Sequence, residues 1–145
     1  MAFRIQVTGI DQSLKKIKSD YEKAANEVDS ELAATCENIL TAAKSYLPAD
    51  FGQLKGSLRI LEKKKFSYTI GSRLNYAAYV EFGTGPYAKS YVPSLEKEWQ
   101  DYARKFKKTK DGNSPHYAYF YPAIRYYIIT LTQRLEYIFS KYERQ

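Results

Sequence analysis

The chain has 145 residues and a formal net charge of +7, and 44% of its residues are hydrophobic. This length fits one folded domain, and the hydrophobic share excludes a chain that is disordered throughout. A single cysteine, Cys36, excludes an intrachain disulfide and a zinc site built from several thiolates. No apolar run reaches the ~20 residues of a membrane helix, and the start has no signal-peptide core, so we expect no membrane association.

The first part of the chain predicts a strand followed by a long helix. Phe3, Ile5 and Val7 alternate with polar residues, which is typical of a strand with one buried face. Asp11 is a suitable N-cap, and apolar residues then recur every three or four positions from 12 to 46. Such a helix would be roughly 50 Å long. Its far part either projects and packs on a neighbouring subunit or lies on the sheet of its own chain.

The remaining elements follow from turn residues and from changes in hydrophobic period. Pro48 ends the long helix, and the lysines 63–65 lie at or near the tip of a predicted hairpin. In chain order we predict a short helical segment at 49–57, hairpin strands at 58–60 and 66–70, one or two helical turns from 76, an amphipathic helix at 94–108 capped by Ser94, and a closing helix with Pro122 in its first turn.

These elements predict an α+β fold. A long N-terminal helix packs on a small antiparallel β-sheet, and a helical insert and a C-terminal helix complete the chain. We expect one domain over residues 1–145, with the inserted helix and loop at about 87–116.

One segment stands out as a candidate structural or interface motif. It ends in Gly83-Thr84-Gly85, so the chain must turn sharply there, and Gly83 is expected to adopt a positive φ. Glu81 is expected to accept backbone N–H groups or to pair with Lys55 or Arg59. The residues of this motif are Tyr76, Ala77, Tyr79, Val80, Glu81, Phe82, Gly83 and Thr84.

Catalytic constellations are not evident. His116 is the one histidine and lies in an aromatic string, which favours a structural role over a catalytic triad. Cys36 falls on the apolar stripe of the long helix and is expected to be an inert core thiol. A small hydrolase is a rival interpretation, and it would require a second acid or a histidine beside Glu81. We therefore predict no catalytic residues, no metal, no cofactor and no enzymatic activity.

Charge is unevenly distributed. The long helix is acidic through Glu22, Glu27, Asp29, Glu31 and Glu37. A basic patch is formed by Arg104, Lys105, Lys107, Lys108 and Lys110. This patch is either a solvated helix end or a contact for an acidic protein or DNA. Opposite charges on one molecule favour head-to-tail association, which closes into a ring when the rotation permits.

Several motifs resemble a known family. Residues 43–48 contain Ala43 and Pro48 in an Ala-X-X-X-X-Pro stretch, and 51–58 resemble a Thr-Gly-X-Leu-Arg-X-Ser element, although Phe51 and Lys55 depart from it. The best match is Tyr-Ala-X-X-Val-Glu-Phe-Gly-Thr at 76–84, and residues 119–123 resemble a later Pro-Ala segment. The chain is thus similar, from about Gly9 to Arg134, to the head–tail connection family of lambdoid long-tailed phages, the tail-component, tail-completion and neck proteins.

This resemblance implies a structural virion protein of the head–tail junction. Such a protein is made in the bacterial host cytoplasm and acts by assembly into a homo-oligomeric ring between the head connector and the tail. Its partners would be other connector and tail proteins, with non-specific contact to passing DNA. The alternative is a basic nucleic-acid-binding module, which the net charge favours but which lacks a recognised signature motif.

Overall fold

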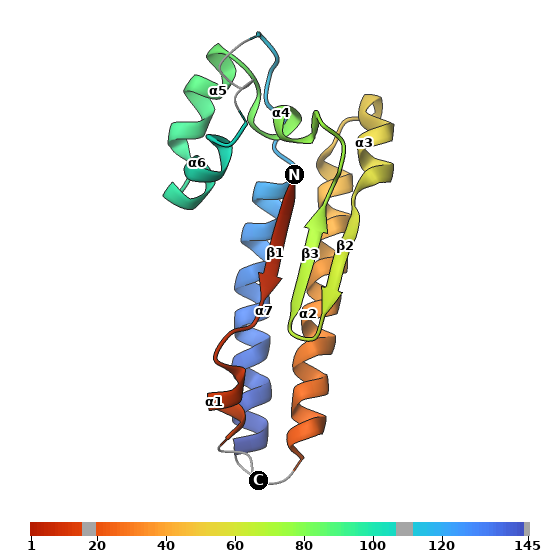
Figure 1. The fold of residues 1–145 in the computed structure, drawn as a ribbon, viewed down its shortest axis with the longest axis vertical. Helices are drawn as coiled ribbons and strands as arrows, with labels where there is room; N and C mark the ends of the chain where they lie inside the picture. The colour runs from red at the N-terminus through yellow and green to blue at the C-terminus, as the bar shows by residue number, and fades with distance from the viewer. Residues whose placement is uncertain (16–19, 107–111, 144–145) are drawn as a thin grey trace.

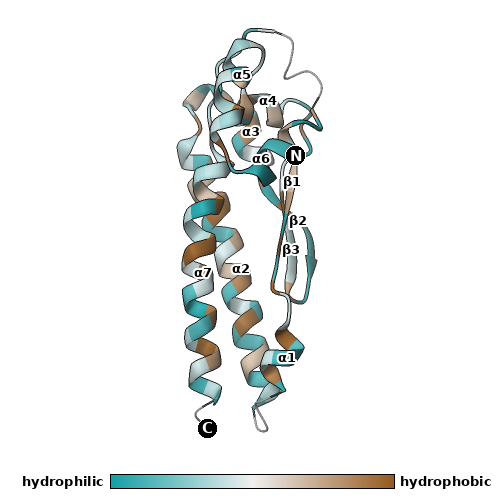
Figure 2. Ribbon diagram, turned by 90° about the vertical axis from the view of Figure 1, so that its left-hand side faces the viewer, coloured by the Kyte–Doolittle hydropathy of each residue, from teal (hydrophilic) through white to brown (hydrophobic). Residues whose placement is uncertain are grey.

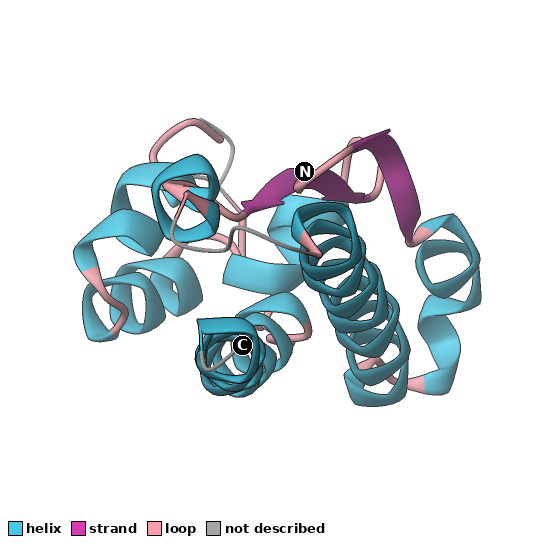
Figure 3. Ribbon diagram, turned by 90° about the horizontal axis from the view of Figure 1, so that it is seen from below, coloured by secondary structure: helices cyan, strands magenta, loops and turns pink. Residues whose placement is uncertain are grey.

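Two long antiparallel helices pack on each other on one side of a three-stranded sheet, and the N-terminal one of the two is nearer to the strands (Figures 1 and 3). The computed structural model describes residues 1–15, 20–106 and 112–143. In chain order the elements are β1 (Ala2–Gln6), α1 (Ile10–Leu14), α2 (Tyr21–Tyr46), η1 (Ala49–Phe51), α3 (Gly52–Ser57), β2 (Arg59–Lys64), β3 (Ser67–Gly71), α4 (Ala77–Phe82), α5 (Pro86–Tyr91), η2 (Val92–Ser94), α6 (Lys97–Ala103) and α7 (Phe120–Glu143).

The sheet has the strand order β1-β3-β2, and both pairs are antiparallel. Ile5, Tyr68 and Ile70 turn inward and are buried against the helices, as period-two alternation predicts. A register shift between Ile60 and Glu62 interrupts the hairpin ladder. The predicted hairpin and α+β class are confirmed, with β2 extending through Lys63 and Lys64.

The main core forms where α2, α7 and the sheet meet. Leu32, Cys36 and Ile39 of α2 are fully buried there, and Leu131 of α7 packs into the same cluster. Figure 2 shows apolar and polar bands alternating along both helices. Each fully buried Leu or Ile side chain contributes about 1.5–3 kcal/mol relative to exposure, so this amphipathic packing is the main stabilising feature of the fold.

The far ends of α2 and α7 extend beyond the sheet, where α1 lies beside them (Figure 1). A second cluster fills this end: Ile10 and Leu14 of α1 pack with Val28 of α2 and with Ile138 and Tyr142 of α7. The projecting part of α2 is therefore covered by its own chain. This explains the helix without the neighbouring subunit that its length suggested.

The prediction of one helix from 12 to 46 is wrong at its start. The structure has a separate helix α1 that ends at Leu14, and α2 begins at Tyr21 after Asp20, whose φ of 60° is left-handed. Predicted stripe residue Ile17 lies outside the described residues. The N-cap of α1 is Gly9, and Asp11 lies in the first turn instead. The stripe continues across the break because α1 covers the same apolar side of α2.

The insert also differs from the prediction. Instead of one helix at 94–108, α5, η2 and the shorter α6 follow one another, and Glu96 rather than Ser94 precedes α6. Pro93 and the extended backbone of Leu95 and Glu96 break the helix at that point. Leu95, in the predicted amphipathic stretch, is nevertheless buried in a third cluster with Ala78 and Phe82 of α4. In the described part of the chain, no helix combines the length and apolarity needed to cross a membrane.

Candidate functional site

The predicted motif at 76–84 forms the helix α4 and the turn that ends it. Ala77, Ala78 and Phe82 are buried, so the small side chains let α4 approach its neighbours while Phe82 anchors it. The Gly83 N–H donates to Tyr79 O at 2.9 Å and closes the last turn. Gly83 has φ 76°, which confirms the predicted left-handed turn.

Glu81 belongs to α4 and is fully buried, with its carboxyl group beside the start of α7. Its Oε1 accepts the Phe120 N–H at 2.7 Å and the Tyr119 N–H at 3.4 Å. The first N–H groups of a helix lack partners within the helix, so this carboxyl satisfies donors that would otherwise be unpaired. Of the two expected roles, acceptance from the backbone is the one observed; in the described residues neither Lys55 nor Arg59 pairs with it.

Burial raises the pKa of Glu81 from 4.5 to about 8, although the backbone N–H groups act in the opposite direction. The second carboxyl oxygen, Oε2, is buried and has no hydrogen-bond partner among the described residues. A carboxyl in this position is held in its neutral form near neutral pH, because an unpaired buried charge is strongly disfavoured.

Further hydrogen bonds fasten α4 to the segment that leads into α7. Val80 O accepts the Tyr117 N–H at 2.7 Å, and the Tyr119 hydroxyl donates to Ala77 O at 2.8 Å. Thr84 and Ser114 bond twice: the Thr84 N–H donates to Ser114 O at 2.9 Å, and the Ser114 N–H donates to Thr84 Oγ1 at 2.8 Å. These hydrogen bonds hold the motif at 76–84 against the segment that leads into α7, and we call this arrangement the structural brace.

The glycines of the turn permit this close approach. A Cβ on Gly83 would lie 3.0 Å from both His116 N and Ser114 O. A Cβ on Gly85, where φ is 56°, would lie only 2.0 Å from Gly112 O. The glycines of this turn are therefore required for the packing of one backbone segment against another.

The outer side of the brace borders an apolar pocket of about 750 Å³. Aromatic side chains of three segments line it: Phe51 from η1, Tyr76 and Tyr79 from the motif, and Tyr117. Phe51 and Tyr117 contact each other with ring centroids 5.4 Å apart. Motif residues therefore have two roles, since Glu81 and Phe82 are internal whereas Tyr76 and Tyr79 are accessible from the pocket.

The predicted basic patch is only partly described. Arg104 is exposed and pairs with Asp101 at 2.8 Å, and Lys105 Nζ lies 5.4 Å from the centroid of the Tyr102 ring. Lys107, Lys108 and Lys110 lie outside the described residues. The structure therefore brings Arg104 and Lys105 to the end of α6 but leaves the patch as a whole a prediction.

The candidate reactive residues occupy structural positions. His116 stacks on Tyr91, with ring centroids 4.0 Å apart and an interplanar angle of 6°. Cys36 is buried in the main core, and desolvation raises the pKa of its thiol to about 12, as expected of an inert thiol. Across residues 1–15, 20–106 and 112–143, no group of three His, Cys, Asp or Glu residues is arranged to hold a metal ion.

Sequence reasoning missed two surfaces. Tyr126, Ile129 and Tyr137 are exposed on α7 although they are large and apolar. Basic residues from separate strands, Arg4 and Arg59, also share one face of the sheet. The first surface could have been found from the sequence, because Tyr126, Ile129 and Tyr137 lie together on the helix face opposite the apolar stripe. The second depends on strand pairing.

The structure is that of an α+β protein in which the motif at 76–84 positions the helix α7. Residues 10–83 match the family described as "Bacteriophage HK97-gp10, putative tail-component", and the chain belongs to this family. The match includes the motif up to Gly83, and it confirms the resemblance found in the sequence. No curated protein and no solved structure matches the chain. The protein is accordingly a bacteriophage tail component.

Proposed function

We propose that this tail component is a structural subunit of the head–tail junction, of the neck or tail-completion type. It acts by assembling into a ring between the head connector and the tail, and not by catalysis. Family membership supports the phage assignment. The observation that carries the assembly role is an apolar surface on α7 that the described parts of the chain leave uncovered.

This surface, the outer α7 face, consists of Tyr126, Ile129 and Tyr137. Their side chains are 63%, 58% and 68% exposed, respectively. Their spacing places them on one side of the helix, over about 16 Å of its length. Aromatic side chains with a polar tip are suited to surfaces that are buried only on assembly. A row of exposed large apolar groups on a monomer marks an interaction site.

The chemistry of the outer α7 face fits a protein partner. Thr130 and Gln133, which lie between its large side chains, are uncharged. Nearby basic residues have partners within the chain: Arg125 pairs with Glu96 and Arg134 with Glu31, each at 3.4 Å, and Lys141, which lies over the Tyr137 ring, pairs with Glu27 at 2.8 Å. Contact with this face therefore removes apolar surface from water.

A ring also requires a second, different surface on each copy. The aromatic pocket beside the motif, which is lined by Phe51, Tyr79 and Tyr117, provides one at the opposite end of the molecule from the far ends of α2 and α7. On this proposal the outer α7 face of one copy, or of a neighbouring tail protein, contacts that pocket. We expect the ring to form mainly on the growing particle, because the surface is a patchwork of charge and not one broad aliphatic face.

Complementation of a phage that lacks this gene tests the proposal. The variant Tyr126→Ser/Ile129→Ser/Tyr137→Ser should fold normally by circular dichroism, yet yield DNA-filled heads and separate tails in electron micrographs. The control Tyr21→Ser/Tyr46→Ser/Tyr87→Ser removes three exposed tyrosines elsewhere and should join heads to tails. Normal joining by the α7 variant would reject this face as the interface. Tails of abnormal length without free heads would place the protein within the tail and reject the junction role.

A further inference from the structure

Most of the acidic side chains of α2 have partners within the molecule. Lys141 Nζ donates to Glu27 Oε2 at 2.8 Å, and Arg134 lies 3.4 Å from Glu31. Asp29 accepts the Phe66 N–H of the hairpin at 2.8 Å. The acidic helix that the sequence offered as a partner for basic surfaces of other copies is therefore a weak candidate for that role, which leaves the basic surfaces available to other anionic partners.

That basic charge lies on the side of the sheet that faces away from the helices. The register aligns three rows across the strands: Ala2, Gly71 and Arg59; Arg4, Thr69 and Glu62; and Gln6, Ser67 and Lys64. Alternate residues of a strand point to opposite faces, and the intervening residues include Ile5, Tyr68 and Ile70, which are buried against the helices. The rows therefore point outward, with Arg4, Arg59 and Lys64 exposed.

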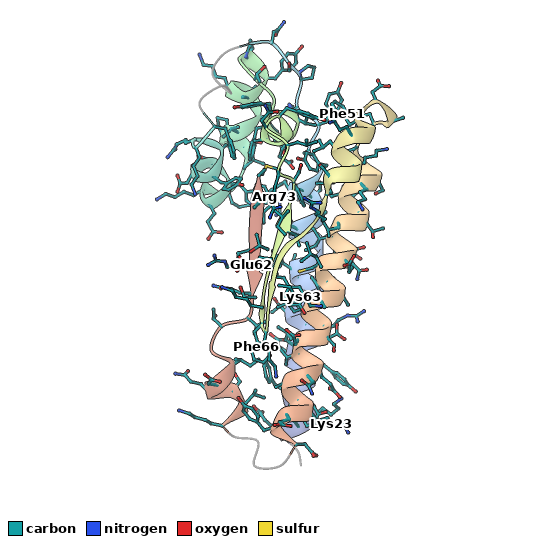
Figure 4. The ribbon with its side chains drawn as sticks, turned by 45° about the vertical axis from the view of Figure 1, so that its right-hand side comes forward. Lys23, Phe51, Glu62, Lys63, Phe66 and Arg73 are labelled. Atoms are coloured by element: carbon teal, nitrogen blue, oxygen red, sulfur yellow. The ribbon has the colours of Figure 1, made fainter. Side chains whose placement is uncertain are left out.

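Further basic residues surround these rows. Lys63, Lys65 and Arg73 are exposed at the edge, the tip and the upper end of the hairpin. Figure 4 shows Arg73, Glu62 and Lys63 in succession along the hairpin. We call this surface the outer sheet face; its basic members are Arg4, Arg59, Lys64, Lys65 and Arg73. Lys63 lies opposite Tyr68 in the register, with its Nζ 5.6 Å from the centroid of the Tyr68 ring, and so belongs to the other face of the sheet. The outer sheet face gathers five of the 23 Lys and Arg residues of the chain.

Only one acid interrupts the outer sheet face. Glu62 lies 3.0 Å from Lys64 Nζ, and the hydrogen bond with Lys64, with a smaller contribution from Arg4, lowers its pKa. It compensates one of the five positive charges at most. The surface therefore has a high positive potential, which attracts anionic partners over about a Debye length.

We propose that the outer sheet face binds the sugar–phosphate backbone of duplex DNA without reading its bases. Protein interfaces centre on aromatic or aliphatic anchors, whereas the outward rows contain no apolar side chain larger than that of Ala2. Between the basic groups stand Gln6, Ser67 and Thr69, side chains of the kind that donate hydrogen bonds to phosphate oxygens. Both features favour a nucleic acid backbone over an acidic protein.

Binding of a labelled duplex of arbitrary sequence, about 30 base pairs long, tests this inference by fluorescence anisotropy at roughly 50 to 300 mM NaCl. The variant Arg4→Gln/Arg59→Gln/Lys64→Gln should lose at least about tenfold in affinity at low salt. The slope of log affinity against log salt should become shallower by about 2–3. The control Lys23→Gln/Lys89→Gln/Lys97→Gln removes the same charge from exposed positions elsewhere and should change affinity less than about threefold.

Three results would overturn the inference: no binding by the wild type at low salt, equal weakening in both variants, or equally tight binding of polyglutamate. If the triple variant unfolds, the single variants Lys64→Gln and Lys23→Gln provide the same comparison, with a slope change of about 0.9 expected only for the first. DNA binding in solution and tail joining in infected cells are separate measurements. Either proposal can therefore fail while the other stands.

Discussion

Glu81 Oε1 accepts the N–H of Phe120 at 2.7 Å, and this bond joins residues 39 positions apart in the chain. It connects the short helix α4 to the first residue of α7, the helix that carries the exposed aromatic face. Because Glu81 is fully buried, its charge cannot contact a partner directly. Its effect on assembly must come through the position of α7.

Replacement of Glu81 by Gln should change how stability depends on pH. Burial raises the pKa of Glu81 to about 8, whereas the unfolded chain ionises near 4.5. Between these values the unfolded state binds fewer protons than the folded state, so the unfolding free energy falls as pH rises. Melting temperatures measured from pH 5 to 9 should decline more steeply for the wild type than for Glu81→Gln, which keeps an acceptor for Phe120.

The exposed Glu37→Gln on α2 serves as the control and should follow the wild-type profile. Parallel profiles for all three proteins would show that Glu81 does not titrate in this window. Because the glutamine preserves the acceptor and its side chain never reaches the surface, Glu81→Gln should also support normal tail joining in a complemented lysate.

Gly83→Val should lower the unfolding free energy by about 1–3 kcal/mol, because a branched side chain is strained at φ 76° and its Cβ would crowd His116 N and Ser114 O. Gly56→Ala is the matched control: this glycine lies in α3, and its added Cβ would meet nothing within 4 Å. Denaturation in urea should show it unchanged or up to about 1 kcal/mol more stable. Equal stability of Gly83→Val and the wild type would reject the turn argument.

Asp29→Ala should destabilise the protein by about 1–3 kcal/mol, since it removes charged acceptors for two donors of the hairpin. Asp29 Oδ1 accepts the Phe66 N–H at 2.8 Å, and Oδ2 accepts the Tyr68 hydroxyl at 3.1 Å. Asp29→Asn keeps an acceptor for the Phe66 N–H and should lower the unfolding free energy by about half as much. Chemical denaturation measures both, with Glu37→Ala as a surface control on the same helix. A loss for Asp29→Ala no larger than that for Glu37→Ala would contradict this assignment.

Cys36 should be unreactive in the folded protein. Its thiol is buried, and its pKa is raised to about 12, so the thiolate that attacks disulfide reagents is scarcely formed near neutral pH. A chromogenic disulfide reagent at pH 8 should detect one thiol per chain in denaturant and almost none without it. Rapid stoichiometric labelling of the native protein would mean that the main core opens readily around α2.

The sequence predicted those elements whose signals are local. The alternation of Phe3, Ile5 and Val7 identified the first strand, and Gly83-Thr84-Gly85 identified a turn with a positive φ, which the structure confirms. The apolar stripe correctly identified the buried residues Leu32, Cys36 and Ile39. It could not locate the break near Asp20, because the period of apolar residues continues from α1 into α2 when both cover one core.

The features that depend on contacts between residues far apart in the sequence were determined only by the tertiary structure. The sequence left Glu81 with two sets of partners, and only the position of α7 selected Phe120 and Tyr119. The sequence favoured the acidic helix as a surface for association, whereas in the structure Arg134 and Lys141 pair with its Glu31 and Glu27. Arg4 and Arg59 became one surface through strand pairing. Composition and hydrophobic periodicity determine which side chains are buried away from water. Whether a charged side chain is neutralised, buried or part of a charged surface depends on the segment that packs beside it in the tertiary structure.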